Sequence, residues 1–169
     1  MQQQPLWQEQ HPPLEAIQDK NLVILLDLNY TLVGNSHLKR QQRGNYASKI
    51  DAETYRPWLV DLVRGHTVLL CTVRHVRYEA QTLQRIKHLT GWLPEGSYFN
   101  PDPDIWDGGI VKARYLPTAF AAYGTPDQRP YFAVESATST KAMYKKLGIA
   151  SASVSNQVWT RLPLPDGLL

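Results

Sequence analysis

The sequence predicts an α/β protein, a three-layer sandwich with a mainly parallel central sheet, and three observations support this. Short apolar runs alternate with longer helical patterns along the 169 residues, which favours parallel strands joined by right-handed crossovers. The three strongest runs are almost continuously apolar, as is typical of strands buried on both faces. Each run also ends in a polar side chain: Asp27, Thr72 and Glu135.

The first third of the chain predicts an arm, a strand, a flap and a helix. Residues 1–20 are polar and Pro-rich and should form a loosely ordered arm, and the run 22–28 predicts the first strand. Residues from about 33 to 55 are mostly polar or basic and predict a short flap, too small for a separate cap domain. A helical pattern starts at Asp51 and reaches a stop signal at Gly65.

The middle of the chain repeats the alternation. The run 67–72 predicts a strand, and a helix should follow over 78–92. Residues 94–109 are rich in Pro, Gly and Asp and predict a loop. The next helix should cover 110–124, where Pro117 can break it.

The last elements follow the same order. The run 131–135 predicts a strand, and the stretch 138–148 predicts a helix with Thr138 as N-cap and Gly148 as its stop. Residues 149–155 could add a final short strand.

Bulk composition fits one ordinary globular domain, which we expect over residues 21–169. Hydrophobic residues make up 43% and charged residues 20%. The net charge of +3 permits an anionic substrate or a nucleic acid without requiring either. The one cysteine, Cys71, excludes an intramolecular disulfide and lies in an apolar run, which predicts a packing role. The chain shows neither a signal peptide nor an apolar run that could span a bilayer, so we expect a cytoplasmic location.

The polar strand ends are the candidate functional residues. Ligands of parallel sheets bind beyond the carboxyl ends of the strands. A carboxylate such as Asp27 that closes an apolar strand must be paired or bound to a metal, unless it caps the following turn. The residues alone leave both interpretations open.

The stretch 22–36, LVILLDLNYTLVGNS, resembles the first motif of the haloacid-dehalogenase-like superfamily, in which an apolar strand precedes Asp-x-Asp-x-Thr-Leu/Val. Asp27 stands at the first acid of this motif and Asn29 at the second. The resemblance implies a Rossmann-like core and phosphatase activity. Asp27 would attack phosphorus and form an aspartyl-phosphate, which divides one difficult step into two easier ones.

Counterparts of the other three motifs follow in the expected order over residues 22–150. By this resemblance, Thr72 would donate a hydrogen bond to a phosphoryl oxygen. Arg74 could clamp the phosphate with two hydrogen bonds. Lys112 would bind the phosphoryl group and neutralise charge on it and on Asp27.

The resemblance also implies a Mg²⁺ ion, held by the Asp27 carboxylate, the Asn29 carbonyl oxygen and Glu135. Two departures from the pattern concern the same site. Asn29 replaces the acid that normally transfers protons, and an amide cannot do this near neutral pH. Ser136 follows Glu135 where a second acid is usual. Three acids of the loop 101–109 could compensate for this missing carboxylate, namely Asp102, Asp104 and Asp107.

Several functions therefore stay open. The protein could be a slow phosphatase, a phosphatase that takes a proton-transfer group from its substrate, or a non-catalytic phosphate-binding or nucleic-acid-binding module. It could also be a protein-interaction domain with a relic pocket. Three tryptophans are compatible with the last function, although core packing is the simpler prediction for them: Trp58, Trp92 and Trp106.

The substrate hypothesis depends on charge and on a closer resemblance. An open site should admit large substrates, and basic residues near it could form a rim for a phosphodiester backbone or only a solvated surface. The layout of residues 65–86, Asp107 with Lys112, and 142–149 is similar to the phosphatase domain of polynucleotide kinase-phosphatases, which implies terminal phosphates of nucleotides or nucleic acids. The chain has no Walker-type loop, so it carries no kinase partner. The rim residues are Lys39, Arg40, Arg43, Arg74, His75 and Arg77.

Overall fold

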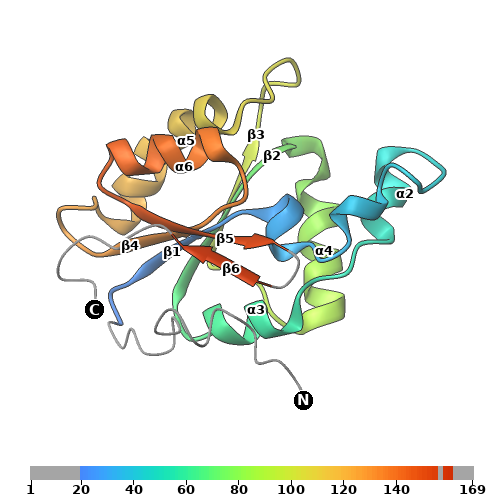
Figure 1. Ribbon diagram of the computed structural model, residues 1–169, viewed down its shortest axis with the longest axis horizontal. Helices are drawn as coiled ribbons and strands as arrows, with labels where there is room; N and C mark the ends of the chain where they lie inside the picture. Colours follow the sequence, from blue (N-terminus) through green and yellow to red (C-terminus); the bar gives the residue numbers. More distant parts are fainter. Residues whose placement is uncertain (1–19, 156–157, 162–169) are drawn as a thin grey trace.

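A computed structural model describes residues 20–155 and 158–161, and its centre is one twisted sheet (Figure 1). The strand order in this described part is β3-β2-β1-β4-β5-β6. The first five strands along this order pair in parallel, whereas β6 pairs with β5 antiparallel. The strands are β1 (Val23–Leu26), β2 (Thr67–His75), β3 (Gly96–Asn100), β4 (Tyr131–Val134), β5 (Ala150–Ser155) and β6 (Val158–Arg161).

Helices cover both faces of the sheet, so the predicted three-layer α/β sandwich is confirmed. Successive side chains of β1 point to opposite faces of the sheet and enter two different cores. Leu26 packs with residues of α3 (Pro57–Val63) and α4 (Glu79–Thr90), and Leu25 packs with residues of α5 (Gly108–Tyr123) and α6 (Thr138–Lys146). Strands between two such layers carry apolar side chains on both faces, which explains the continuous apolar runs. The helices are α2 (Tyr46–Asp51), α3 (Pro57–Val63), α4 (Glu79–Thr90), α5 (Gly108–Tyr123) and α6 (Thr138–Lys146).

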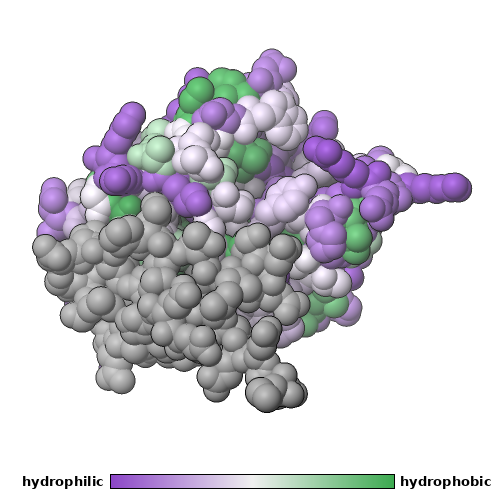
Figure 2. Space-filling view, viewed as in Figure 1, coloured by the Kyte–Doolittle hydropathy of each residue, from purple (hydrophilic) through white to green (hydrophobic). Residues whose placement is uncertain are grey.

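Short turns follow the carboxyl ends of the strands and build the flap. The wide turn η2 (Leu28–Leu32) follows β1 directly, and η3 (Ser36–Leu38) leads into the flap before α2. The 3-10 turn η4 (Val76–Tyr78) links β2 to α4. In Figure 2 hydrophilic residues gather over the projecting flap at the right. None of the helices in the described part of the chain is both long and apolar enough to cross a bilayer.

The structure corrects four expectations about the elements. The segment expected as a loop contains the edge strand β3, and the flap contains the helix α2. Pro117 lies inside α5 without ending it. Thr138 is the first helical residue of α6, and Ala137 takes the N-cap position. The expected N-terminal arm falls almost wholly on residues 1–19, outside the described residues.

The strand order places a switch point between β1 and β4. The chain leaves β1 toward β2 on one side, whereas β4 and β5 lie on the other. Connections that diverge in this way open a crevice at the carboxyl ends of the two strands, where α/β proteins bind their ligands. Asp27 and Glu135 follow these two strands directly.

Candidate functional site

Asp27 lies at the start of the η2 turn and is 7% exposed. Its Oδ2 accepts hydrogen bonds from Thr31 Oγ1 at 2.8 Å and from Ser136 Oγ at 2.9 Å. The next turn is strained, because Tyr30 has a φ of 59°, which is uncommon for a residue other than glycine. The strained turn carries the chain away from the sheet and leaves the Asp27 carboxylate at the crevice.

Lys112 joins the two carboxylates of the crevice. Its Nζ lies 2.9 Å from Asp27 Oδ1 and 2.5 Å from Glu135 Oε2, and all three side chains are buried. Burial alone would lower the pKa of Lys112, but the charges of the two carboxylates outweigh it and raise this pKa. Burial and the charge of Asp27 raise the pKa of Glu135 to about 7, against the opposing effect of Lys112. The strand ends and α5 thus bring these three predicted residues together.

Close packing of α5 on α6 places Lys112 at the sheet. A Cβ added to Gly108, in the first turn of α5, would lie 2.2 Å from Thr140 Oγ1 of α6. Asp107 caps α5 by accepting the N–H of Ile110 at 3.0 Å. The glycine therefore permits an approach that a larger residue would prevent, and the cap fixes where the helix begins.

Thr72 and Arg74 lie beside this group rather than in it. Thr72 is buried, and its Oγ1 accepts the backbone N–H of Arg74 at 3.0 Å. The Arg74 guanidinium is also buried and pairs through both Nη atoms with Glu53. Its remaining Nη bonds go to Thr82 Oγ1 at 2.8 Å and Asn29 Oδ1 at 3.0 Å. The Arg74 Nη atoms, which were expected to clamp a phosphate, are therefore already hydrogen-bonded to protein side chains.

Glu53 is a buried functional candidate that the sequence analysis missed. It follows α2 in the flap, is 0% exposed, and pairs with Lys39 Nζ at 2.6 Å as well as with Arg74. Tyr55 OH donates to its Oε2 at 3.1 Å. No local sequence pattern indicated this role, because the two cations that pair with Glu53 lie far from it along the chain.

Asn29 lies between two charged groups: the first is Asp27, Glu135 and Lys112, and the second is Glu53, Arg74 and Lys39. Its Oδ1 accepts from Arg74 Nη2 at 3.0 Å and from Lys39 Nζ at 2.9 Å. Its backbone oxygen accepts from Ser136 Oγ at 3.3 Å. Since both side-chain contacts come from cations that can only donate, the amide oxygen must face them.

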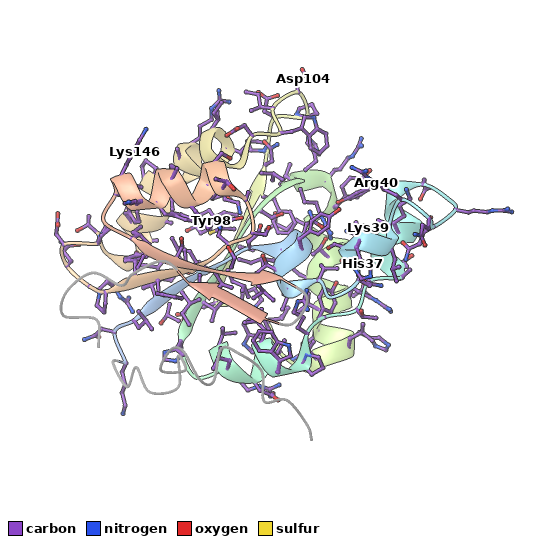
Figure 3. All side chains as sticks on the ribbon, viewed as in Figure 1. His37, Lys39, Arg40, Tyr98, Asp104 and Lys146 are labelled. Carbon is purple, nitrogen blue, oxygen red and sulfur yellow. The ribbon has the colours of Figure 1, made fainter. Side chains whose placement is uncertain are left out.

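A pocket of about 310 Å³ opens at these residues. Figure 3 shows the flap that carries Lys39 and Arg40 on one side of the carboxyl edge, and the loop that carries Asp104 on another. Trp106 lines the pocket and is 67% exposed, so its predicted core position is wrong. The polar lining includes Asp27, Asn29, Lys39, Lys112, Glu135 and Ser136.

The acids of the loop before α5 do not reach the pocket lining. Asp102 Oδ1 accepts the backbone N–H of Asp104 at 3.0 Å, and its Oδ2 lies 3.6 Å from Arg114 Nη1. Asp107 serves as the cap of α5. These acids shape the loop and the helix start, and they do not supply the second acid that the fourth motif lacks.

The oxygens that could hold Mg²⁺ converge at Ser136. Its hydroxyl contacts both Asp27 Oδ2 and the Asn29 carbonyl oxygen. Glu135 is engaged elsewhere, because its Oε1 accepts the N–H groups of Ser136 and Ala137 and its Oε2 holds the buried lysine. No three acidic, His or Cys side chains form a metal cluster within the described residues. One carboxylate and two neutral oxygens still fit Mg²⁺, which is often bound through one or two carboxylates, waters and a substrate phosphate.

The comparisons with known proteins support the fold. No family model and no curated protein matches the chain. Among solved structures, a chain of the Pnkp1/Rnl/Hen1 RNA repair complex is similar, with a TM-score of 0.56 and 15% sequence identity. The match covers 86% of this chain and 43% of that one, so this chain spans less than half of its neighbour's length. At this identity the likeness shows a shared fold.

Proposed function

We propose that this protein is a phosphohydrolase of the haloacid-dehalogenase-like type in which Asp27 attacks phosphorus. The observation that carries the proposal is the buried Lys112 between Asp27 and Glu135, at the carboxyl ends of β1 and β4 and in the wall of a pocket. This arrangement places the Asp27 carboxylate beside a fixed positive charge that a phosphoryl group can share.

In the proposed first step, an Asp27 oxygen bonds to phosphorus and the ester oxygen leaves, taking a proton from solvent. In the second, water attacks phosphorus, releases phosphate and restores the Asp27 carboxylate, while its proton goes to solvent. Lys112 stabilises the charge of both transition states. The Thr72 hydroxyl, inside β2, accepts the backbone N–H of Arg74, and its own O–H would donate to the phosphoryl group. Asn29 transfers no proton, so the first step proceeds without a general acid and the second without a general base.

The proposed cofactor is Mg²⁺, which would supply positive charge opposite the phosphoryl oxygens. Asp27 and the Asn29 carbonyl oxygen remain the proposed ligands. The Ser136 hydroxyl contacts both of them, and Glu135 already holds Lys112. We therefore place Ser136, rather than Glu135, third in this set.

For the substrate we propose terminal phosphates of nucleotides or nucleic acids. The open pocket, the basic flap and the fold shared with a chain of an RNA repair complex support this choice. A second candidate is a phosphate-binding or nucleic-acid-binding module without turnover, which the amide of Asn29 in place of a carboxyl group favours.

The test is phosphate release from an aryl phosphate and from 5′- and 3′-phosphorylated oligonucleotides, with and without Mg²⁺. Asp27→Asn should abolish release, and EDTA should reduce it. The control is Asp61→Asn, because the side chain of Asp61 is 75% exposed and its nearest ion-pair contact is 3.8 Å. Full activity of Asp27→Asn would exclude the proposed mechanism. Salt-sensitive oligonucleotide binding that survives Asp27→Asn, without turnover, would instead support the second candidate.

A further inference from the structure

A second group of buried charges lies outside the proposed chemistry. Glu53 is the one carboxylate in direct contact with two cations, Arg74 and Lys39, among the described residues. Arg74 is 1% exposed and the Lys39 side chain 14% exposed. One negative and two positive charges leave a surplus of one positive charge in a place with little water, which is costly unless an anion balances it.

The other groups in direct contact with the two cations do not remove this surplus. Both lie 5.5 Å from the centre of the Tyr46 ring, whose face attracts cations but carries no net charge. Arg74 Nε has no acceptor within the described part of the chain. Burial and the charge of Arg74 lower the pKa of Lys39 despite the attraction of Glu53, so Glu53 does not fully compensate Lys39.

Asn29 connects this surplus to the pocket. Its Oδ1 is held by Arg74 and Lys39, which leaves its two N–H groups as the remaining hydrogen-bonding capacity of a side chain that lines the pocket. Lys39 lines the same pocket. The pocket lining therefore contains two hydrogen-bond donors, the charged Lys39 ammonium and the neutral Asn29 amide, next to the surplus positive charge.

We propose that Lys39 and the Asn29 amide form an anion subsite, positioned by Glu53 and Arg74, that binds a phosphate group without help from a metal ion. The inference rests on the proposed function only in treating the pocket as a phosphate site, and it does not depend on turnover. Lys39 belongs to the flap, so the subsite also ties the flap to the bound anion. Glu53 acts through its partners and is a positioning residue.

The experiment measures binding of inorganic phosphate to the full chain, stripped of metal with EDTA, by isothermal titration calorimetry. Lys39→Met removes the charged donor and should weaken binding at least about tenfold, because a charge-assisted hydrogen bond is lost. Asn29→Asp is nearly isosteric but cancels the surplus charge, so it should weaken binding by a similar factor. Lys39→Arg should retain most of the affinity. The matched control is Arg40→Met, which removes the exposed charge next along the flap and should change affinity less than about twofold.

The outcomes separate this inference from the proposed function. Metal-free binding that is lost in Lys39→Met and Asn29→Asp but kept in Arg40→Met supports the subsite, whether or not the protein hydrolyses phosphate esters. Binding that requires Mg²⁺ overturns the subsite and leaves the phosphohydrolase intact. Equal phosphate affinity of Lys39→Met and the unchanged protein also overturns it, provided that circular dichroism shows both proteins to be folded.

Discussion

Replacing Asn29 by Asp should accelerate turnover by acting on one step of the reaction. The introduced carboxylate would occupy the position of the amide oxygen, 3.0 Å from Arg74 Nη2 and 2.9 Å from Lys39 Nζ. Two cations at this distance strongly favour the ionised form of a carboxyl group. The new group would therefore act as a base toward water in the second step and would be a poor acid for the leaving group in the first.

An aryl phosphate makes this difference measurable, because its leaving group needs no acid. The unchanged protein should release a burst of about one phenolate per chain and then turn over slowly, since water attacks the aspartyl-phosphate without a base. Asn29→Asp should raise the steady rate at saturating substrate by about 10²–10⁴-fold, the usual contribution of a general base. This corresponds to a barrier lower by about 3–5 kcal/mol.

Stopped-flow measurement of phenolate release in the presence of Mg²⁺ gives the burst and the steady rate together. Asn29→Ala serves as the control, because it removes the amide without adding a base and should not raise the rate. A steady rate in Asn29→Asp no higher than that of the unchanged protein, at saturating substrate, would refute the reasoning. Absence of a burst in the unchanged protein would show that the second step does not limit turnover.

Three further predictions concern the stability and reactivity of the site. Lys112→Met leaves two carboxylates buried without their cation and should lower the free energy of unfolding in urea by about 3–5 kcal/mol, whereas the exposed Lys145→Met should change it by less than about 0.5 kcal/mol. Equal midpoints for the two variants would contradict the buried pairing. Burial raises the pKa of the Cys71 thiol to about 12, so iodoacetamide should label it near pH 8 only as fast as the protein unfolds, and rapid labelling of the native protein would be inconsistent with this. Gly108→Ala should lower the unfolding free energy by about 1–3 kcal/mol through its clash with Thr140. Adding Thr140→Ala should restore most of that loss, since the hydroxyl has no partner in the described structure, and a double variant no more stable than the single one would exclude the clash.

The sheet and the first charged group follow from the sequence because both depend on local signals. Apolar runs located β1, β2 and β4, and the parallel arrangement then forces the residues after β1 and β4 to one edge. Thr72 was expected to end its strand, but β2 continues to His75. The edge strand β3 escaped detection because it is short, begins with Gly96, and buries only its last two residues. The helix α2 was missed because it has only six residues and buries only Ile50, although Asn45 caps it by accepting from Ser48 N–H at 2.9 Å.

The second charged group could not be predicted, because its members meet only in the folded chain. Arg74 follows Thr72 by two residues, and the resemblance therefore assigned it to phosphate. In the structure its guanidinium pairs with Glu53, which lies 21 residues earlier. The sequence pattern predicts that this segment is the start of a helix. A buried glutamate has no signature in such a segment, since exposed helix positions also carry glutamate.

Together the two groups explain how the site can tolerate an amide where the resemblance expects an acid. The contacts of Asp27, Glu135 and Lys112 leave one negative charge unpaired on one side of Asn29, and those of Glu53, Arg74 and Lys39 leave one positive charge unpaired on the other. An acid at position 29 would neutralise the unpaired positive charge of Arg74 and Lys39, whereas the amide leaves it in place. The same substitution that removes proton transfer thus leaves positive charge available to a phosphate. Phosphate affinity and turnover should therefore respond in opposite directions when the acid is restored.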